Sequence, residues 1–236
     1  MNLTPIHTDI FRERQDLPAF ITRFLPSVTE KTVLAVASKL VCLWKGLSVA
    51  YESTAQKEAL IRQESTAALQ TPLAWLTVKA GMVMTNAGID ESNADGKLLL
   101  LPQDCYACAE ELRTALQAHY GVKELGIVIT DSMILPLRAG VIAGAVGYAG
   151  FQGVKDLRGK ADIFGKKLAV TLVDAADTLA SAAALCMGEA DETCPLCVIE
   201  RAPVVFTAHT RPQEMHYPAK DDLYAPLFKA VGLLKD

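Results

Sequence analysis

Two kinds of hydrophobic pattern alternate along the chain. Short, unbroken apolar runs, which are typical of buried strands, occur at 33–38, 125–130, 168–173 and 195–200. Longer stretches with helical character occur at 16–25, 56–69, 106–119 and 174–187. Strands and helices follow one another irregularly, so the pattern predicts an α+β fold with mixed sheets and packed helices rather than a doubly wound sheet.

Local signals at the ends of these segments support the same elements. Asp16 and Asp174 stand where an N-cap is expected, and Gly121 stands where a helix ends. The apolar runs 75–79 and 82–85 are joined by Ala80-Gly81, which predicts a β-hairpin. Because the sequence has no repeats and no low-complexity linker, we expect a single domain over residues 1–236.

Composition narrows the class of protein. The chain has 236 residues, 51% of them hydrophobic, and a formal net charge of -4, so it can bury a large core and lacks the basic balance of a nucleic-acid-binding protein. Its longest apolar stretch, 139–151, is shorter than the roughly 20 residues of a membrane span. Charged residues interrupt the first 16 positions as well. We therefore expect a cytoplasmic protein with reduced thiols, no membrane partner and no nucleic-acid partner.

The polar stretch 85–96, TNAGIDESNADG, lies between two apolar runs and is the first candidate for chemistry. Asp90 lies in this stretch, and Asp131 ends the predicted strand 125–130, with Ser132 beside it. Carboxylates and hydroxyls at such positions are the oxygen ligands that Mg²⁺ or Mn²⁺ prefers. The alternative is that Asp90 stabilises a turn and Asp131 caps the next segment.

Two cations lie near predicted structural edges. Lys39 follows the strand 33–38, and Arg138 lies in the segment 136-PLRAG-140. An arginine there could hold a phosphate or a substrate carboxylate through two hydrogen bonds, and a surface arginine is the alternative. Neither the G-x-G-x-x-G nor the G-x-x-x-x-G-K-[ST] nucleotide motif occurs.

Two CxxC pairs, 105-CYAC-108 and 194-CPLC-197, raise the possibility of a four-cysteine zinc site. The first pair enters a predicted helix. The second enters a predicted strand, where Cys194 and Cys197 would point to opposite faces. Buried thiols are therefore the preferred interpretation, and a zinc or thiol-redox protein is the alternative.

Several segments taken together resemble one family. They are 38-SKLVCLWKG-46, 61-IRQES-65, 86-NAGIDESN-93, 101-LPQDCYACAEELR-113, 127-IVITDS-132, 136-PLRAG-140, 147-GYAGFQGVKDLRGKADIFGKKLAVT-171 and 176-ADTLASAAALCMGE-189. In this order they are similar to the coenzyme F-420-0:L-glutamate ligase family, from about residue 5 to residue 228. The NAGxDxSN and TDS elements are the most specific part of the resemblance.

The resemblance implies roles for individual residues. Asp90 matches a metal-binding aspartate, and Asp131 with Ser132 matches a second metal-binding pair. The residues matched to nucleotide binding are Ser38, Lys39, Asn93 and Glu189. Arg138 is our own addition, as a catalytic residue that would contact a phosphate or carboxylate.

The resemblance also implies an activity and partners. Family members join L-glutamate to an acceptor carboxylate through an amide bond, with GTP or ATP as co-substrate and Mg²⁺ or Mn²⁺ as cofactor, and they form homodimers. Here Leu43 replaces a lysine, and 132-SMILPLRAGV-141 lacks a Gly, an Arg, a Trp and a Gln of the usual pattern. These departures are similar to a branch proposed to glutamylate folate-like acceptors. The alternative is a nucleotide- or pterin-binding homologue with a regulatory role.

Overall fold

The structure is a computed structural model that describes residues 1–233, so positions 234–236 of the predicted domain lie outside the described residues. It contains helices and mixed sheets, which confirms the predicted α+β class. The α-helices are α1 (Leu17–Phe24), α2 (Ser38–Trp44), α3 (Thr54–Gln63), α4 (Cys105–Tyr120), α5 (Ala175–Met187) and α6 (Ala225–Ala230). Three 3-10 turns are η1 (Asn86–Gly88), η2 (Pro212–Met215) and η3 (Ala219–Asp221).

The largest sheet has five strands in the order β1-β12-β2-β8-β9. Among the described strands of this sheet, β2 and β8 run parallel and the other neighbours run antiparallel. The bounds are β1 (Asn2–Ile6), β2 (Thr32–Ala37), β8 (Leu125–Met133), β9 (Ile142–Ala149) and β12 (Leu196–Glu200).

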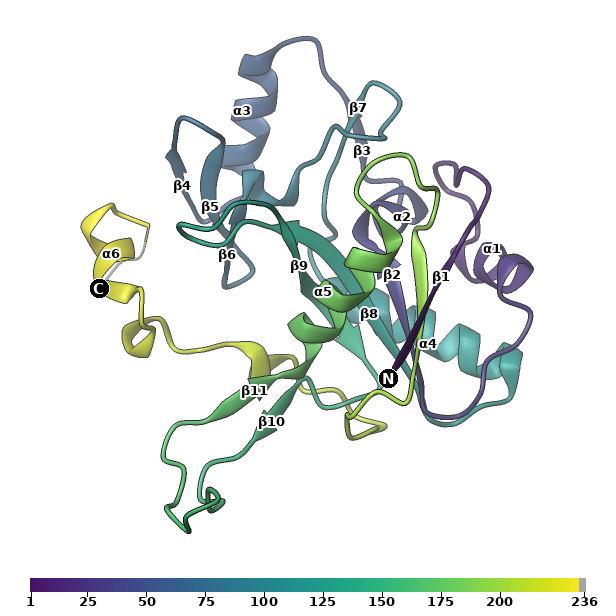
Figure 1. Cartoon of the computed structure of the whole chain (residues 1–236). Helices are drawn as coiled ribbons and strands as arrows, with labels where there is room; N and C mark the ends of the chain where they lie inside the picture. Colours follow the sequence, from purple (N-terminus) through teal and green to yellow (C-terminus); the bar gives the residue numbers. More distant parts are fainter. Residues whose placement is uncertain (234–236) are drawn as a thin grey trace.

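Side-chain alternation along these strands divides the core into two layers. In β2, Leu34 and Val36 belong to the cluster that α4 covers, whereas Val33 and Ala35 belong to the cluster that α5 covers. The sheet therefore has helices on both faces, with α5 across the front in Figure 1 and α4 behind it, where α1 and α2 also contribute side chains to the core. The unbroken apolar runs of β2 and β8 follow from this burial on both sides.

Smaller strand groups sit beside the main sheet. A three-stranded sheet, β4-β5-β6, packs near α3 and η1, and β3 pairs with β7. In the three-stranded sheet, β5 and β6 form a hairpin, which confirms the β-hairpin predicted from the sequence. Ala80 and Gly81 at its tip both have positive φ, as tight hairpin turns require. The bounds are β3 (Ser48–Ala50), β4 (Ala67–Gln70), β5 (Trp75–Lys79), β6 (Met82–Thr85) and β7 (Lys97–Leu99).

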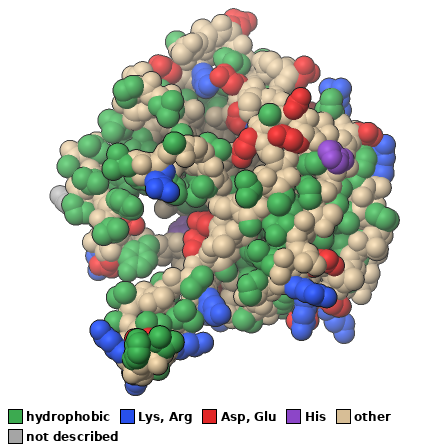
Figure 2. All heavy atoms as spheres, in the orientation of Figure 1, with side chains coloured by type: hydrophobic (Ala, Val, Ile, Leu, Met, Phe, Trp, Pro, Cys, Tyr) green, Lys and Arg blue, Asp and Glu red, His purple; other side chains and the backbone are tan. Residues whose placement is uncertain are grey.

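Two segments extend away from this body (Figure 1). One is an arm built on the pair β10 (Val154–Asp156) and β11 (Leu172–Asp174), and basic and hydrophobic side chains cover its tip in Figure 2. The other is the C-terminal segment with η2, η3 and α6. Glu214 holds η2 against the body, because its Oε1 accepts hydrogen bonds from the Tyr148 hydroxyl at 2.7 Å and the Gly153 amide at 2.5 Å.

Several local predictions are confirmed. Asp16 caps α1 by accepting from the Ala19 amide, and Asp174 caps α5 by accepting from the Asp177 amide. Gly121 ends α4 with a left-handed backbone, φ 68°. None of the helices in residues 1–233 combines the length and apolar character that crossing a bilayer requires.

Other predicted boundaries are wrong. The helix predicted over 56–69 ends at Gln63, and 67–70 forms β4, because pairing with β5 outweighs helical propensity there. The strand predicted over 168–173 is limited to Leu172–Asp174, in an arm that exposes Val170 and has no core to bury it. Ser38 begins α2 instead of ending β2. Asp131 does not end β8, which continues to Met133 by pairing with β9.

Candidate functional site

Asp131 and Ser38 meet at the carboxyl ends of two parallel strands. Ala37, the last residue of β2, pairs with Thr130 of β8, so the residues that follow them lie side by side. The buried Ser38 hydroxyl donates a hydrogen bond to Asp131 Oδ1 at 2.8 Å. Asp131 itself pairs with Gly144 of β9. The carboxylate is therefore carried by a strand that has a neighbour on each side.

Asp90 belongs to the loop between η1 and β7. Its backbone forms both hydrogen bonds of an isolated bridge with Leu99, at 3.1 and 2.8 Å. Its Oδ1 accepts from the Ser92 amide at 2.7 Å, and its Oδ2 lies 2.7 Å from Lys39 Nζ. Because Lys39 follows Ser38 at the start of α2, one turn of helix contacts both aspartates.

The two carboxylates influence each other's charge. Burial raises the pKa of Asp131 to about 6, and the nearby negative charge of Asp90 adds to this, against the Ser38 hydrogen bond and Lys39. Burial also acts to raise the pKa of Asp90, but Lys39 and Ser92 outweigh it and hold this pKa below its ordinary value. Above pH 6 the site thus concentrates negative charge that a bound cation would offset.

Ser132 and Asn93 join the site to the turn after α5. The Ser132 hydroxyl donates to Glu189 Oε2 at 2.9 Å, and Asn93 Nδ2 donates to the Ala190 carbonyl at 2.9 Å. Glu192 orders this turn by accepting from the Ala190 amide at 2.8 Å. These contacts place Glu189 and Asn93 at the same edge of the sheet as Asp90 and Asp131, and the roles of the four residues in binding stay predictions.

The donor set suits a hard divalent cation. Within residues 1–233, no three His, Cys, Asp or Glu side chains gather closely enough to enclose a metal by themselves. Mg²⁺ typically binds one or two carboxylates and completes its shell with water and substrate phosphates. Asp90 and Asp131 fit that pattern, and the Lys39 ammonium group neutralises part of their charge. The Ser132 hydroxyl, one residue further along β8, contacts Glu189 in this structure.

Arg138 stands apart from these residues. It lies in the exposed loop between β8 and β9, and its side chain forms no hydrogen bond or ion pair within residues 1–233. The described part of the chain therefore gives no contact between Arg138 and either aspartate. Its proposed role with phosphate or carboxylate stays a prediction.

The two CxxC pairs lie on different faces of the main sheet. Cys105 and Cys108 belong to the cluster under α4, whereas Cys197 belongs to the cluster under α5. All six cysteines are free thiols. Burial raises the pKa of Cys105 to about 12 and that of Cys197 to about 11, so these thiols are poor nucleophiles. The two pairs cannot share one four-cysteine site in this fold.

The sequence analysis missed the role of Gly88 and Leu101. Gly88 has φ +70°, and a Cβ added there would lie 2.2 Å from Leu101 Cδ1 and 3.5 Å from Asp131 Oδ2. Glycine thus lets the backbone of η1 approach the carboxylate closely. The glycine inside the NAG segment is the signal that could have indicated this approach.

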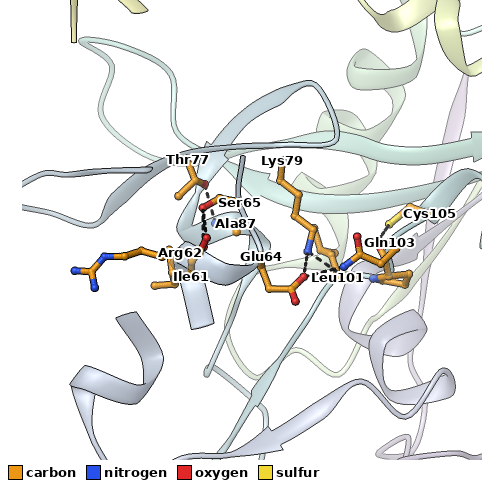
Figure 3. Close-up of polar contacts among 11 residues, drawn as sticks. Ile61, Arg62, Glu64, Ser65, Thr77, Lys79, Ala87, Leu101, Gln103 and Cys105 are labelled. Carbon is orange, nitrogen blue, oxygen red and sulfur yellow. Dashed lines mark hydrogen bonds and ion pairs between the residues drawn. The ribbon is translucent and has the colours of Figure 1, made fainter. Parts of the chain in front are cut away.

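A buried ion pair was also missed. Lys79, at the end of β5, has its Nζ 2.8 Å from Glu64 Oε2, and the same oxygen accepts from Gln103 Nε2 at 3.0 Å (Figure 3). Lys79 also reaches the Leu101 carbonyl at 3.4 Å. These residues come from three segments, so no local pattern indicates the contact.

Comparisons with known proteins identify the family of this chain. Residues 5–201 match the family described as F420-0:Gamma-glutamyl ligase. A protein of Methanopyrus kandleri named Coenzyme F420:L-glutamate ligase is 45% identical over 122 residues, which are 51% of this chain and 48% of that protein. Proteins of the same name are 41% identical over 132 residues in Methanococcus maripaludis and 36% identical over 146 residues in Methanocaldococcus jannaschii.

These alignments cover 56% and 62% of this chain, and 53% and 58% of the two relatives, respectively. The chain thus spans about half the length of the curated relatives it matches. The family match is broader, since it includes both aspartates, the Ser38-Lys39 turn and Glu189. On this evidence the chain belongs to the F420-0:gamma-glutamyl ligase family.

Proposed function

We propose that this protein is a ligase that joins the amine of L-glutamate to the carboxylate of an acceptor, using a nucleoside triphosphate and a divalent cation. The convergence of Asp90 and Asp131 beside Ser38 and Lys39 carries the proposal. The names of the relatives support it, because all those cited above are called L-glutamate ligases.

A carboxylate and an amine do not condense in water without activation. In the proposed reaction an acceptor carboxylate oxygen attacks the γ-phosphorus, the nucleoside diphosphate leaves, and an acyl phosphate forms. The glutamate amine then attacks the acyl carbon and phosphate leaves. Charge on the phosphoryl oxygens dominates the first step, so positioning and electrostatic stabilisation supply most of the catalysis.

Each residue of the site has a task in this scheme. Asp90 and Asp131, with Ser132, would hold Mg²⁺ or Mn²⁺, which supplies positive charge next to the phosphates when bound. Ser38 fixes the orientation of Asp131 by its hydrogen bond. Lys39 can move from Asp90 to a phosphate oxygen once a cation binds, because its ammonium group is carried on a flexible side chain. Asn93 and Glu189 order the turn around the nucleotide.

We also propose GTP or ATP as the co-substrate, a homodimer as the working form, and an acceptor that is F-420-0 or a folate-like acid. The departures in 132–141 favour the folate-like branch. The loop that carries them lies directly after the site strand β8, where it can contact a bound acceptor.

The test is glutamate-dependent phosphate release with Mg²⁺ or Mn²⁺, with each nucleotide against F-420-0, pteroate, dihydropteroate and dihydrofolate, and mass spectrometry of the product. We expect a product heavier by one glutamyl residue with at least one pair. Asp90→Asn is expected to abolish it, and Asp95→Asn, a change of the same type in the same loop, is expected to retain it. Metal-dependent nucleotide binding without any product would instead favour the regulatory homologue.

A further inference from the structure

Glu91 follows the proposed cation ligand Asp90 in the chain and has no role in the scheme above. Its carboxylate is bound from two sides: Oε2 accepts a hydrogen bond from the Tyr51 hydroxyl at 2.7 Å, and Oε1 lies 3.0 Å from Lys57 Nζ. Both contacts hold the pKa of Glu91 below its ordinary value, so the carboxylate is ionised at neutral pH. We call the three side chains Tyr51, Glu91 and Lys57 the clamp.

The clamp ties the loop to the layer that α3 and the small sheet β4-β5-β6 form beside the main sheet (Figure 1). Lys57 lies in α3 and is 20% exposed, and Tyr51 packs against the small hydrophobic cluster that contains the buried Ile89. Ile89 and Glu91 are the two neighbours of Asp90 in the chain. Both neighbours of the proposed ligand are therefore attached to this layer.

The side chain of Asp90 points away from that layer. Its backbone pairs with Leu99 in an isolated antiparallel bridge, and Ile89 before it is extended, so consecutive side chains point to opposite sides. The Asp90 carboxylate accordingly meets Lys39 at the start of α2, whereas Ile89 and Glu91 contact the α3 layer. The loop thus presents one carboxylate to the main sheet while the residues on either side hold it from the other layer.

Glu91 is also the middle residue of the turn that orients the Asp90 carboxylate. The Ser92 amide donates to Asp90 Oδ1 at 2.7 Å, which is the hydrogen bond of an Asx turn over residues 90–92. The direction of the Ser92 N–H depends on the peptide plane between Glu91 and Ser92, and the clamp restricts that plane. In the proposed function Lys39 leaves Asp90 for a phosphate oxygen, and the Ser92 amide then keeps the carboxylate in place.

We propose that Glu91 is a positioning residue: held by Tyr51 and Lys57, it sets the orientation in which Asp90 binds the divalent cation. The proposal rests on the proposed function and deepens it, because it adds a residue that acts on the cation site of that scheme. Glu91 does not bind the cation itself, since its two carboxylate oxygens face Tyr51 and Lys57. Groups that orient a metal ligand from outside typically contribute about 10- to 100-fold to metal affinity.

A through-space effect of the clamp's charges predicts a different pattern of variants. Removing the positive charge of Lys57 would by itself strengthen cation binding, and removing the neutral Tyr51 hydroxyl would leave it nearly unchanged. Positioning predicts weaker binding in both cases, because each change removes one of the two contacts to Glu91. Lys57→Met and Tyr51→Phe therefore separate the two explanations, the first of them by the sign of its effect.

The test measures the affinity for Mn²⁺ by electron paramagnetic resonance, with Mn²⁺ alone and with GTP or ATP, in the wild type, Glu91→Ala, Tyr51→Phe and Lys57→Met. Glu58→Ala is the matched control, because it breaks another ion pair on the surface of α3 and leaves the clamp intact. Exchange of the Ser92 amide proton, followed by NMR without metal, reports on the turn directly. Urea unfolding shows whether each variant keeps its fold, and Glu91→Gln, which retains one acceptor oxygen, replaces Glu91→Ala if that variant does not.

We expect Glu91→Ala to weaken Mn²⁺ binding about tenfold or more and to speed exchange of the Ser92 amide proton. Tyr51→Phe and Lys57→Met should weaken Mn²⁺ binding by a smaller factor, and Glu58→Ala should match the wild type. In the ligase assay Glu91→Ala should need more Mn²⁺ for its half-maximal rate, and kcat at saturating Mn²⁺ should return close to the wild-type value. A general loss of structure would instead lower kcat at every Mn²⁺ concentration.

The possible results distinguish this proposal from the proposed function. Tighter Mn²⁺ binding in Lys57→Met, or an unchanged affinity in a folded Glu91→Ala variant, would overturn the positioning role and leave the ligase function intact. If Glu91→Ala weakens Mn²⁺ binding but no acceptor gives a product, the positioning role stands and the ligase function fails. If the wild type binds no Mn²⁺ with either nucleotide, the cation site fails and the positioning role fails with it.

Discussion

The ion pair between Lys79 and Glu64 gives the sharpest test of how the region beside the site is held. The side chains are only 7% and 12% exposed, and their charged atoms are 2.8 Å apart. Gln103 donates to the same carboxylate oxygen, so Glu64 has two donors (Figure 3). The perturbation is Lys79→Met, which keeps most of the side-chain volume and removes the charge.

Removing one partner of a buried pair leaves the other charge without compensation, at a cost of about 3–5 kcal/mol. Because Gln103 still donates to Glu64, we expect Lys79→Met to lower the free energy of unfolding by about 3 kcal/mol, near the lower limit. For a chain of this length that corresponds to a fall in Tm of about 6–12 °C.

The double variant separates charge from packing. In Lys79→Met/Glu64→Gln no charge remains, and the new amide oxygen can still accept from Gln103. We expect its free energy of unfolding to lie within about 1 kcal/mol of the wild type. Lys97→Met breaks the more exposed pair with Glu13, 45% and 29% exposed, and should destabilise the protein much less than Lys79→Met, because solvent screens this pair.

Urea unfolding of the wild type, both single variants, the double variant and the Lys97 control provides the measurement. A double-mutant cycle then gives the coupling energy between Lys79 and Glu64. The reasoning is refuted if Lys79→Met changes the free energy of unfolding by less than about 0.5 kcal/mol, or if the double variant is no more stable than Lys79→Met.

Three further predictions concern the site and the core around it. With chelator present, Asp131→Asn should be more stable than the wild type at pH 8, by at most about 3 kcal/mol, and equal at pH 4. Burial raises the pKa of Asp131 in the folded protein from 3.8 to about 6, so the stability that this carboxyl contributes is present below pH 4 and lost as the pH rises through 6. The prediction is contradicted if urea unfolding gives the same difference between variant and wild type at both pH values. Gly88→Ala should lower the free energy of unfolding by about 2 kcal/mol, because the new Cβ would clash with the Leu101 side chain and the backbone has φ +70°. Adding Leu101→Ala removes the clash and should recover part of this loss, as thermal melts would show. Asp174→Asn keeps the cap on α5 but removes a carboxyl group whose pKa is raised to about 7 by burial and by Asp177. The free energy of unfolding of the variant should therefore exceed that of the wild type by less than about 1 kcal/mol at pH 8 and equal it at pH 3. Urea titrations at both pH values measure this difference.

Local chemistry accounts for the parts of the fold that were predictable. Asp16, Asp174 and Gly121 act within one turn of their own helices, and Ala80-Gly81 acts within its own hairpin. Their structural effect therefore depends little on distant residues. Three strands of the main sheet, β2, β8 and β12, were found because their apolar runs are buried by helices on both faces, whereas β1 and β9 were not predicted.

The errors lie where distant contacts decide the structure. Residues 67–70 have a helical pattern but pair with β5, and the last residues of β8 extend because β9 lies beside them. The carboxylates Asp90 and Asp131 could be selected as candidates from their positions after apolar runs. The hydrogen bond from Ser132 to Glu189 could not, since the two residues are 57 positions apart.

The links within the site have a consequence for folding kinetics. Ser38 and Asp131 are 93 positions apart in the chain, and Asn93 is 97 positions from the carbonyl of Ala190 that it contacts. Contacts between residues so far apart close large loops, and the chain loses the entropy of those loops before the contacts add any stability. The proposed cation site therefore forms only once β2, β8 and the end of α5 are assembled. If the site binds Mg²⁺ as proposed, the recovery of Mg²⁺ binding after dilution from urea would time the completion of the native topology.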